Sequence, residues 1–119
     1  MRVVDSDGNI KTVVGTSQKG NTGDGGDGRQ ATLNGPKHLC FDLNGNVIIA
    51  DTENHVIRKY SPKDGRIVRI TGSGVKGSKG IGGSSLEVQL NQPHGVYVHK
   101  DGSLYISDSS NHRVLKIER

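Results

Sequence analysis

The chain repeats itself with a period of 57 residues, and the two copies align without a gap. Asp51-Thr-Glu-Asn54-His55 falls on Asp108-Ser-Ser-Asn111-His112, and seven glycines of the first copy fall on glycines of the second. A fixed long period indicates stacked copies of one supersecondary unit, which bury their faces only against neighbours. Two copies are fewer than the three or so that repeat folds need. The sequence therefore predicts that the chain completes its fold with copies of itself.

The apolar residues indicate strands. Only 30% of the residues are hydrophobic, but they cluster in short β-branched runs such as residues 47–50 and 104–106. Runs of this kind are typical of buried strands. Most of the 18 glycines lie in the long segments between them. We therefore expect an all-β fold with glycine-rich loops, in which the single cysteine, Cys40, is a packed core thiol.

Each period contains four predicted strands, named A to D. Asn44-Gly45 and Asp101-Gly102 are typical of tight hairpin turns between A and B. The predicted ranges are 39–42 and 96–99 for A, 47–51 and 104–108 for B, 56–60 and 113–117 for C, and 9–14 and 66–71 for D.

The passages that carry these strands resemble NHL repeats. The first runs from Leu33-Asn-Gly-Pro36 through Asp51-Thr-Glu-Asn54-His55, and the second from Leu90-Asn-Gln-Pro93 through Asp108-Ser-Ser-Asn111-His112. The family's motif tends to carry Gly where this chain has Glu53 and Ser110. The resemblance implies that each repeat is one four-stranded blade of a β-propeller, usually of six blades. The chain is then a single propeller segment over 1–119, with an N-terminal strand D at 9–14, blade one at 38–71 and an incomplete blade two at 95–118.

This order leaves blade two without its outer strand and the N-terminal strand D without a sheet. Two blades span about a third of a six-bladed ring, so these segments lie too far apart to pair within one chain. They can pair between copies, because a head-to-tail contact that closes makes a ring. We therefore expect a homotrimer in which residues 9–14 pair with residues 113–117 of a neighbour. A four-bladed dimer and an eight-bladed tetramer are the geometric alternatives.

The polar motif recurs once per repeat, which argues for a structural role because an active site is rarely duplicated in every repeat. Its aspartate and asparagine groups can bond to the turn between strands B and C. Arg58 falls on Leu115, so the sequence does not support an obligatory Asp–Arg pair. The predicted structural residues are Asp51, Asn54, His55, Asp108, Asn111 and His112.

No residue is predicted to be catalytic or to bind a cofactor or a metal ion. Residues 23–28 are rich in Gly and Asp, but they lack the Lys-Ser/Thr of a P-loop. Both acids are replaced in the second copy, by Ile81 and Ser84. His38, His94 and His99 lie near the ends of the A strands without a cluster of carboxylates or histidines. No signal peptide or transmembrane stretch is visible, so we expect no membrane partner, and the localisation stays open.

The favoured function is a non-catalytic scaffold that presents loops on a ring to a protein or peptide. The resemblance also allows two alternatives. One is binding of single-stranded RNA, since the net charge is +4 and the lysines could form a basic face if the loops converge. Its weakness is that the loops carry no aromatic residue for base stacking. The other is a fragment of a metal-dependent lyase or lactonase-like propeller. The residues of the basic face are Lys37, Lys76, Lys79 and Lys100.

Overall fold

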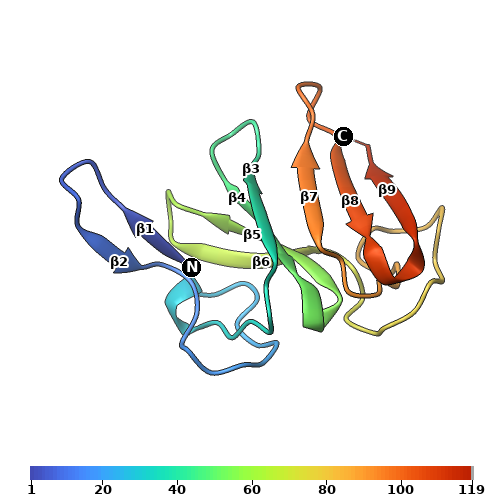
Figure 1. The fold of residues 1–119 in the computed structure, drawn as a ribbon, viewed down its shortest axis with the longest axis horizontal. Coiled ribbons are helices and arrows are strands. Elements are labelled where there is room, and N and C mark those ends of the chain that lie inside the picture. Colours follow the sequence, from blue (N-terminus) through green and yellow to red (C-terminus); the bar gives the residue numbers. More distant parts are fainter. Residues whose placement is uncertain (119) are drawn as a thin grey trace.

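The computed structural model describes residues 1–118, which form antiparallel sheets joined by long loops (Figure 1). Blade one is a sheet of order β3-β4-β5-β6, and blade two is a sheet of order β7-β8-β9. The two sheets stand side by side, with β3 next to β7. The strands of blade one are β3 (His38–Phe41), β4 (Val47–Asp51), β5 (Val56–Ser61) and β6 (Arg66–Thr71). Those of blade two are β7 (Gly95–Val98), β8 (Leu104–Asp108) and β9 (Arg113–Ile117).

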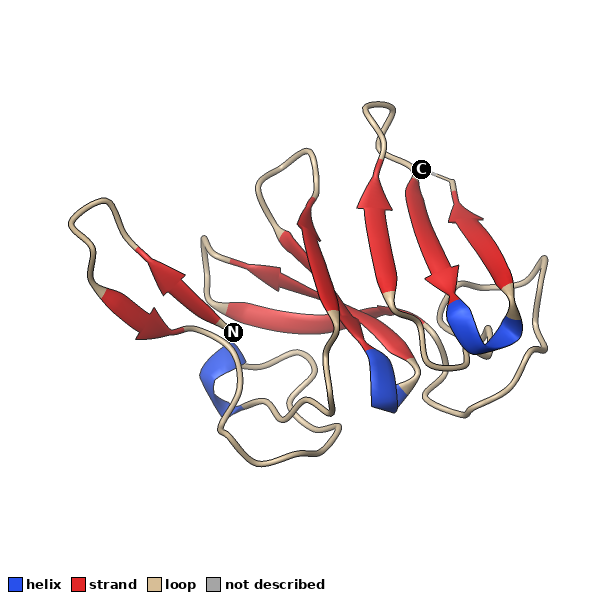
Figure 2. Cartoon of the chain, viewed as in Figure 1, coloured by secondary structure: helices blue, strands red, loops and turns tan. Residues whose placement is uncertain are grey.

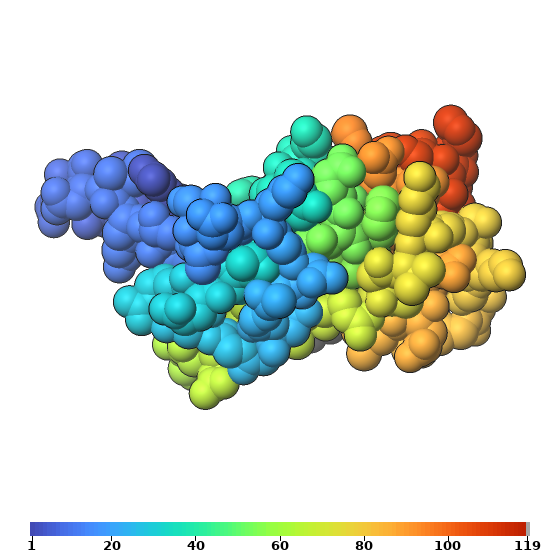
Figure 3. Space-filling model, turned by 90° about the horizontal axis from the view of Figure 1, so that it is seen from below, coloured from blue at the N-terminus to red at the C-terminus, as the bar shows by residue number. Residues whose placement is uncertain are grey.

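Helical structure within residues 1–118 is limited to short 3-10 turns, and the all-β prediction is confirmed. These turns are η1 (Gly28–Gln30), η2 (Thr52–Asn54) and η3 (Ser109–Asn111), and Figure 2 shows them at the same end of the sheets. Figure 3 views this end, which is covered by the two long loops, coloured blue to cyan and yellow to orange. We call it the loop face.

The turns follow the sequence signals. Gly45 and Gly102 have φ values of +81° and +90°, which a glycine adopts without strain, and each closes an A–B hairpin. The B–C turns end on a histidine in the left-handed region, with φ of 57° at His55 and 55° at His112. The two repeats therefore share backbone geometry as well as sequence.

Blade one packs its inner face against blade two. Strand residues alternate between faces, so the apolar core between the blades draws on every second residue of each sheet. From blade one it takes Ile48, Ala50 and Ile57, and from blade two it takes Val96, Leu104 and Ile106, all of them buried. The opposite face of blade one covers a second cluster that includes Val14, Val47, Ile49, Tyr60 and Ile67.

The N-terminal segment differs from the prediction. The sequence predicted a strand over residues 9–14 with no partner in its own chain. Instead β2 (Ile10–Thr12) pairs with β1 (Arg2–Val4) in a hairpin, so this part of the prediction was wrong. The turn between them is stabilised by the Asp5 carboxylate, which accepts the N–H groups of Asp7 and Asn9 at 2.9 Å. Residues 9–14 are not paired with β9 of the same chain, which is an edge strand.

Shortening a side chain in the core between the blades tests how much this core contributes to the free energy of unfolding. Ile57 is fully buried, and Ile57→Ala should lower the free energy of unfolding by about 3 kcal/mol through lost burial and the cavity left behind. Ile81→Ala, at an exposed loop position, should change it by less than about 0.5 kcal/mol. Urea denaturation measures both. Equal effects of the two variants would show that the blades do not share a packed core.

Candidate functional site

The polar motif of blade one forms a buried cluster around Asp51, the last residue of β4. Its side chain is fully buried. Oδ1 accepts the Asn34 N–H at 2.8 Å, while Oδ2 accepts Asn54 Nδ2 at 2.8 Å and Arg58 Nη1 at 3.3 Å. Asn54 Nδ2 also donates to the Gly20 carbonyl at 2.7 Å. The carboxylate therefore ties the end of a central strand to the long loop.

Blade two repeats this cluster around Asp108. Its carboxylate accepts the Asn91 N–H at 2.7 Å, Asn111 Nδ2 at 2.8 Å and Arg113 Nε at 2.8 Å. Asn111 Nδ2 also donates to the Gly77 carbonyl at 2.7 Å. The aspartate and asparagine contacts thus recur in both repeats.

Each cluster contains an arginine, although the two arginines occupy different positions in the repeat. Arg58 is the third residue of β5 and Arg113 is the first residue of β9. Strand residues two apart share a face, so both guanidinium groups reach the same place. Arg58 donates to the Thr32 carbonyl at 2.6 Å, and Arg113 donates to the equivalent carbonyl of Gln89 at 3.1 Å. The sequence argument against an Asp–Arg pair was wrong, because it compared residues only at equal positions.

Burial and hydrogen bonding shift the pKa of the Asp51 carboxyl in opposite directions. Burial raises the pKa of its carboxyl, while the Asn34 N–H, Asn54 and the Arg58 charge act to lower it. The net direction is upward. Its hydrogen bonds come from groups of the same chain, which is the arrangement expected of a structural carboxylate.

The motif histidine of blade one joins the two blades. His55 Nδ1 accepts the Gln92 N–H at 3.0 Å, and the neighbouring Thr52 hydroxyl donates to the Pro93 carbonyl at 2.7 Å. Near the A strands, His38 Nδ1 accepts the Val96 N–H at 3.2 Å. These three bonds form a polar seam along the apolar core. Burial lowers the pKa of His55.

Comparison with known proteins gives the family. The family model described as the NHL repeat matches residues 90–117. The chain belongs to the NHL-repeat family. It is 31% identical over 93 residues to Protein SUPPRESSOR OF QUENCHING 1, chloroplastic, of Arabidopsis thaliana, and 29% identical over 93 residues to NHL repeat-containing protein 2 of Homo sapiens. The matches cover 78% and 71% of this chain but 9% and 13% of those relatives, so the chain spans a small part of their length.

Solved structures share the fold of this NHL-repeat chain. A structural genomics protein of unknown function from Bacteroides thetaiotaomicron superposes with a TM-score of 0.78 and 23% identity, over 97% of this chain and 28% of that one. An auxiliary nutrient binding protein from the same organism gives a TM-score of 0.74 and 22% identity, over 97% of this chain and 31% of that one. These neighbours are propeller-type proteins. The sequence prediction of NHL repeats is confirmed, whereas a ring of six blades is not tested by these matches.

The lysines of the predicted basic face do not all lie together. Lys37 precedes the start of β3, while Lys100 follows the end of β7. Since β3 and β7 run in the same direction (Figure 1), these two lysines lie at opposite ends of the sheets. Lys76 and Lys79 belong to the second long loop, which is bonded to the η3 end through Gly77 and Asn111. Three of the four lysines are therefore at the loop face.

The other polar candidates of the NHL repeats are engaged with the chain itself. Asp24 pairs with Arg58 at 3.0 Å, and Asp27 with Arg29 at 2.8 Å. Within residues 1–118, no group of three or more His, Cys, Asp or Glu is placed to hold a metal ion. Nor does that part of the chain contain a helix long and apolar enough to cross a membrane. Cys40 is half-buried against the core between the blades, and this burial raises the pKa of its thiol.

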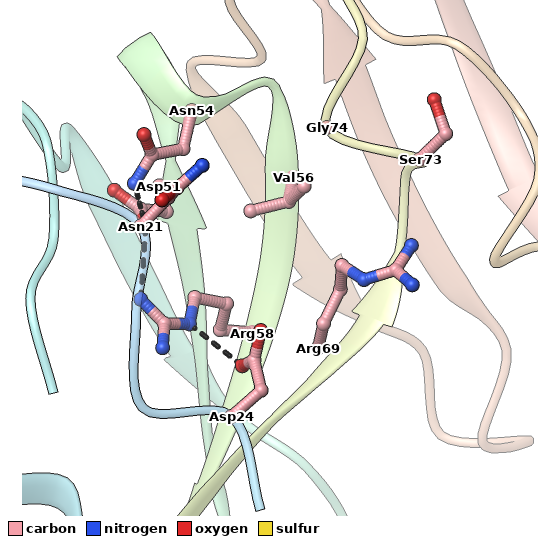
Figure 4. A pocket seen from close by; sticks show the side chains of 9 residues that line it. All are labelled: Asn21, Asp24, Asp51, Asn54, Val56, Arg58, Arg69, Ser73 and Gly74. Carbon is pink, nitrogen blue, oxygen red and sulfur yellow. Dashed lines mark hydrogen bonds and ion pairs between the residues drawn. The ribbon is translucent and has the colours of Figure 1, made fainter.

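A small polar pocket of about 110 Å³ adjoins the Asp51 cluster (Figure 4). Arg58 and Asp24 face each other across one side of it, and Arg69 lines the other. The Arg69 guanidinium donates to the carbonyls of Gly72 and Leu86. Charged groups that line this pocket are thus already bonded to the chain, and sequence reasoning missed Arg69 because it lies outside the repeated motif.

Moving the arginine within its strand tests the equivalence of the two clusters. Arg58→Leu leaves a buried carboxylate without its counter-charge and should lower the free energy of unfolding by about 3 kcal/mol. Val56→Arg combined with Arg58→Leu recreates the order of blade two and should recover at least half of this loss. Lys63→Leu, in an exposed turn, is the control and should be nearly neutral. Denaturant titration that shows no recovery in the double variant would contradict the equivalence.

The His55 bond predicts a pH dependence of stability. Its Nδ1 can accept the Gln92 N–H only when unprotonated, and the folded pKa lies below the ordinary value of 6.5. The unfolded chain therefore binds more protons near that pH, so this group's contribution to stability falls as the pH decreases through 6.5. His55→Asn, which tolerates the left-handed backbone, should show a smaller loss between pH 7.5 and 5.5 in urea titrations. Equal losses in the variant and the parent chain would refute this role.

Proposed function

We propose that this chain is a non-catalytic interaction module, and that copies of it complete a ring of propeller blades that presents the loop face to a protein or peptide. The observation that supports this proposal is the chemistry of the two outward faces of the blades. They match the two halves of the interface that the blades form with each other inside the chain.

The apolar residues on the two outward faces are the repeat equivalents of residues that pack between the blades. On the open side of blade one, Leu39 and Phe41 are the repeat equivalents of Val96 and Val98, which pack against blade one in the core. On the open side of blade two, Tyr97 and Val114 are the equivalents of Cys40 and Ile57. Phe41 is 65% exposed, Tyr97 58% and Val114 67%. Large apolar side chains gathered on an open face are typical of an association surface.

The polar groups at the outward faces are likewise the repeat equivalents of those in the seam between the blades. In the seam within the chain, His55 and Thr52 bond to the Gln92 N–H and the Pro93 carbonyl. Blade two carries His112 and Ser109 at the positions of His55 and Thr52. Blade one carries Gly35 and Pro36 at the positions of Gln92 and Pro93, and these supply the same backbone groups. Two ends that differ from each other but match head to tail favour a closed ring, and three copies give the six blades usual for this family.

The loop face is the surface we propose for a ligand. It carries the long loops of both repeats (Figure 3), and the clusters around Asp51 and Asp108 hold those loops on the ends of the B strands. Loops positioned by a rigid scaffold are common binding elements. Single-stranded RNA is the second candidate, because Lys37, Lys76 and Lys79 lie at this face. A protein or peptide is preferred, since base stacking requires aromatic residues that these loops lack.

A charge placed on the open face of blade one tests assembly. The parent chain should have a native mass of three times the 12.7 kDa of one chain. Phe41→Glu should give a monomer that still folds, because Phe41 is exposed in the single chain. Val75→Glu, at an exposed position of the second loop, should assemble like the parent. Light scattering distinguishes these masses, and a parent chain that stays monomeric at micromolar concentrations would refute the ring.

A further inference from the structure

A groove runs between strand β9 and the loop of residues 80–85, at the outer side of blade two. Its volume is about 600 Å³, and Gly82, Gly83, Val88 and Leu115 are part of its lining. Strand β9 is at the edge of its sheet. The backbone groups on such an edge are a template for a further strand.

Blade one shows what an equivalent groove holds. There the loop of residues 23–28 bonds to β6, the outer strand. The Gly25 N–H donates to the Ile67 carbonyl at 2.7 Å, and the Ile67 N–H donates to the Gly26 carbonyl at 3.0 Å. The Gly28 N–H donates to the Gly65 carbonyl at 2.8 Å. The repeat equivalents of these three loop residues are Gly82, Gly83 and Ser85, so blade two has the same cradle, and within residues 1–118 no strand occupies it.

Strand β2 is the repeat counterpart of β6. Gly8 and Ile10 fall on Gly65 and Ile67, and Lys11 falls on Val68. Ile67 is fully buried, whereas Ile10 is 60% exposed in the N-terminal hairpin. The sequence of β2 therefore has the residues of an outer strand, but the hairpin leaves its isoleucine in solvent.

The pairing of β2 with β1 is short. It contains three residue pairs, whereas β5 and β6 form five. Strand β1 also resembles the end of β9, since Arg2 and Val3 fall on Lys116 and Ile117 two periods later. Two-stranded hairpins are marginally stable in isolation. Strand β9 offers a longer ladder than β1 in a register shifted by one residue, because Lys11 lies opposite Val3 in the hairpin and would lie opposite Lys116 in the register of blade one.

We infer that the groove of blade two binds strand β2 of a second copy. In this arrangement β2 separates from β1 of its own chain and pairs with β9 of its neighbour. This inference rests on the proposed ring and adds the segment that joins neighbouring copies. The exchange buries Ile10, lengthens the ladder and supplies backbone partners for Gly82 and Gly83. It is a form of β-strand addition, in which main-chain hydrogen bonds provide affinity and alternate side chains provide specificity.

Paired cysteines in the full chain, on a Cys40→Ala background, test the exchange. Lys59 and Val68 lie opposite each other in blade one, and their counterparts are Lys116 and Lys11. Lys11→Cys with Lys116→Cys should therefore form disulfides between copies, seen as covalent oligomers larger than dimers on a non-reducing gel. Each single-cysteine variant can form no more than a dimer and is the control.

The matched control locks the hairpin. Val3 and Lys11 lie opposite each other in β1 and β2, so Val3→Cys with Lys11→Cys should form a disulfide within one chain and remain a monomer in native mass measurements. Ile10→Lys should weaken assembly about ten-fold or more, because the side chain is exposed in the hairpin but buried in the groove. Lys11→Gln should assemble like the parent, since its counterpart Val68 is partly exposed.

Three outcomes are informative. Covalent chains of copies without a fixed size support the groove and contradict the closed ring. A Lys11→Cys, Lys116→Cys variant that forms only the dimers of the single variants contradicts the inferred exchange. Assembly that persists with the hairpin locked also contradicts the exchange, and leaves the open blade faces as the contact between copies.

Discussion

Face-to-face packing of one blade on the next is the interaction on which the rest of this structure depends. A four-stranded sheet with apolar residues on both faces cannot shield itself, and Ile57 is buried in a core that blade two forms together with Val88 and Leu90 of the loop before it. The repeat equivalent of Ile57 in blade two, Val114, has no such cover and is mostly exposed. Equivalent apolar positions are therefore covered inside the chain and exposed on the outward faces of the two blades.

The buried carboxylates of Asp51 and Asp108 bind the long loops to the ends of the packed sheets. Asp51 and Asp108 end the B strands and accept the N–H groups of Asn34 and Asn91 in the long loops. The loops are rich in glycine, and these bonds, together with buried apolar residues such as Ala31 and Leu90, give them a fixed path over the end of each sheet. His55 of blade one also accepts the N–H group of Gln92, in the loop that leads to blade two. A catalytic use of these groups would compete with this structural use.

Much of the fold was readable in the sequence, because the period of 57 residues and the short β-branched runs place the strands of both blades. The N-terminal hairpin was missed because β1 has three residues, although the offset that aligns Gly8 with Gly65 also places Arg2 on Lys59, within strand C. The arginine cluster was missed because Arg58 and Arg113 differ in position, and only the alternation of side chains along a strand makes them equivalent. The division of the predicted lysines between the two ends of the sheets could have been read from the sequence, because Lys37 precedes its A strand whereas Lys100 follows its A strand.

In the proposed ring, other copies of the chain cover the open faces of the blades. Amide hydrogen exchange, measured by mass spectrometry over a range of concentrations, reports which strands this contact protects. Segments containing β3, β7 and β9 should become more protected as the concentration rises, while the protection of the core strand β4 should stay constant. Exchange in β3, β7 and β9 that is fast and independent of concentration would contradict the proposed ring.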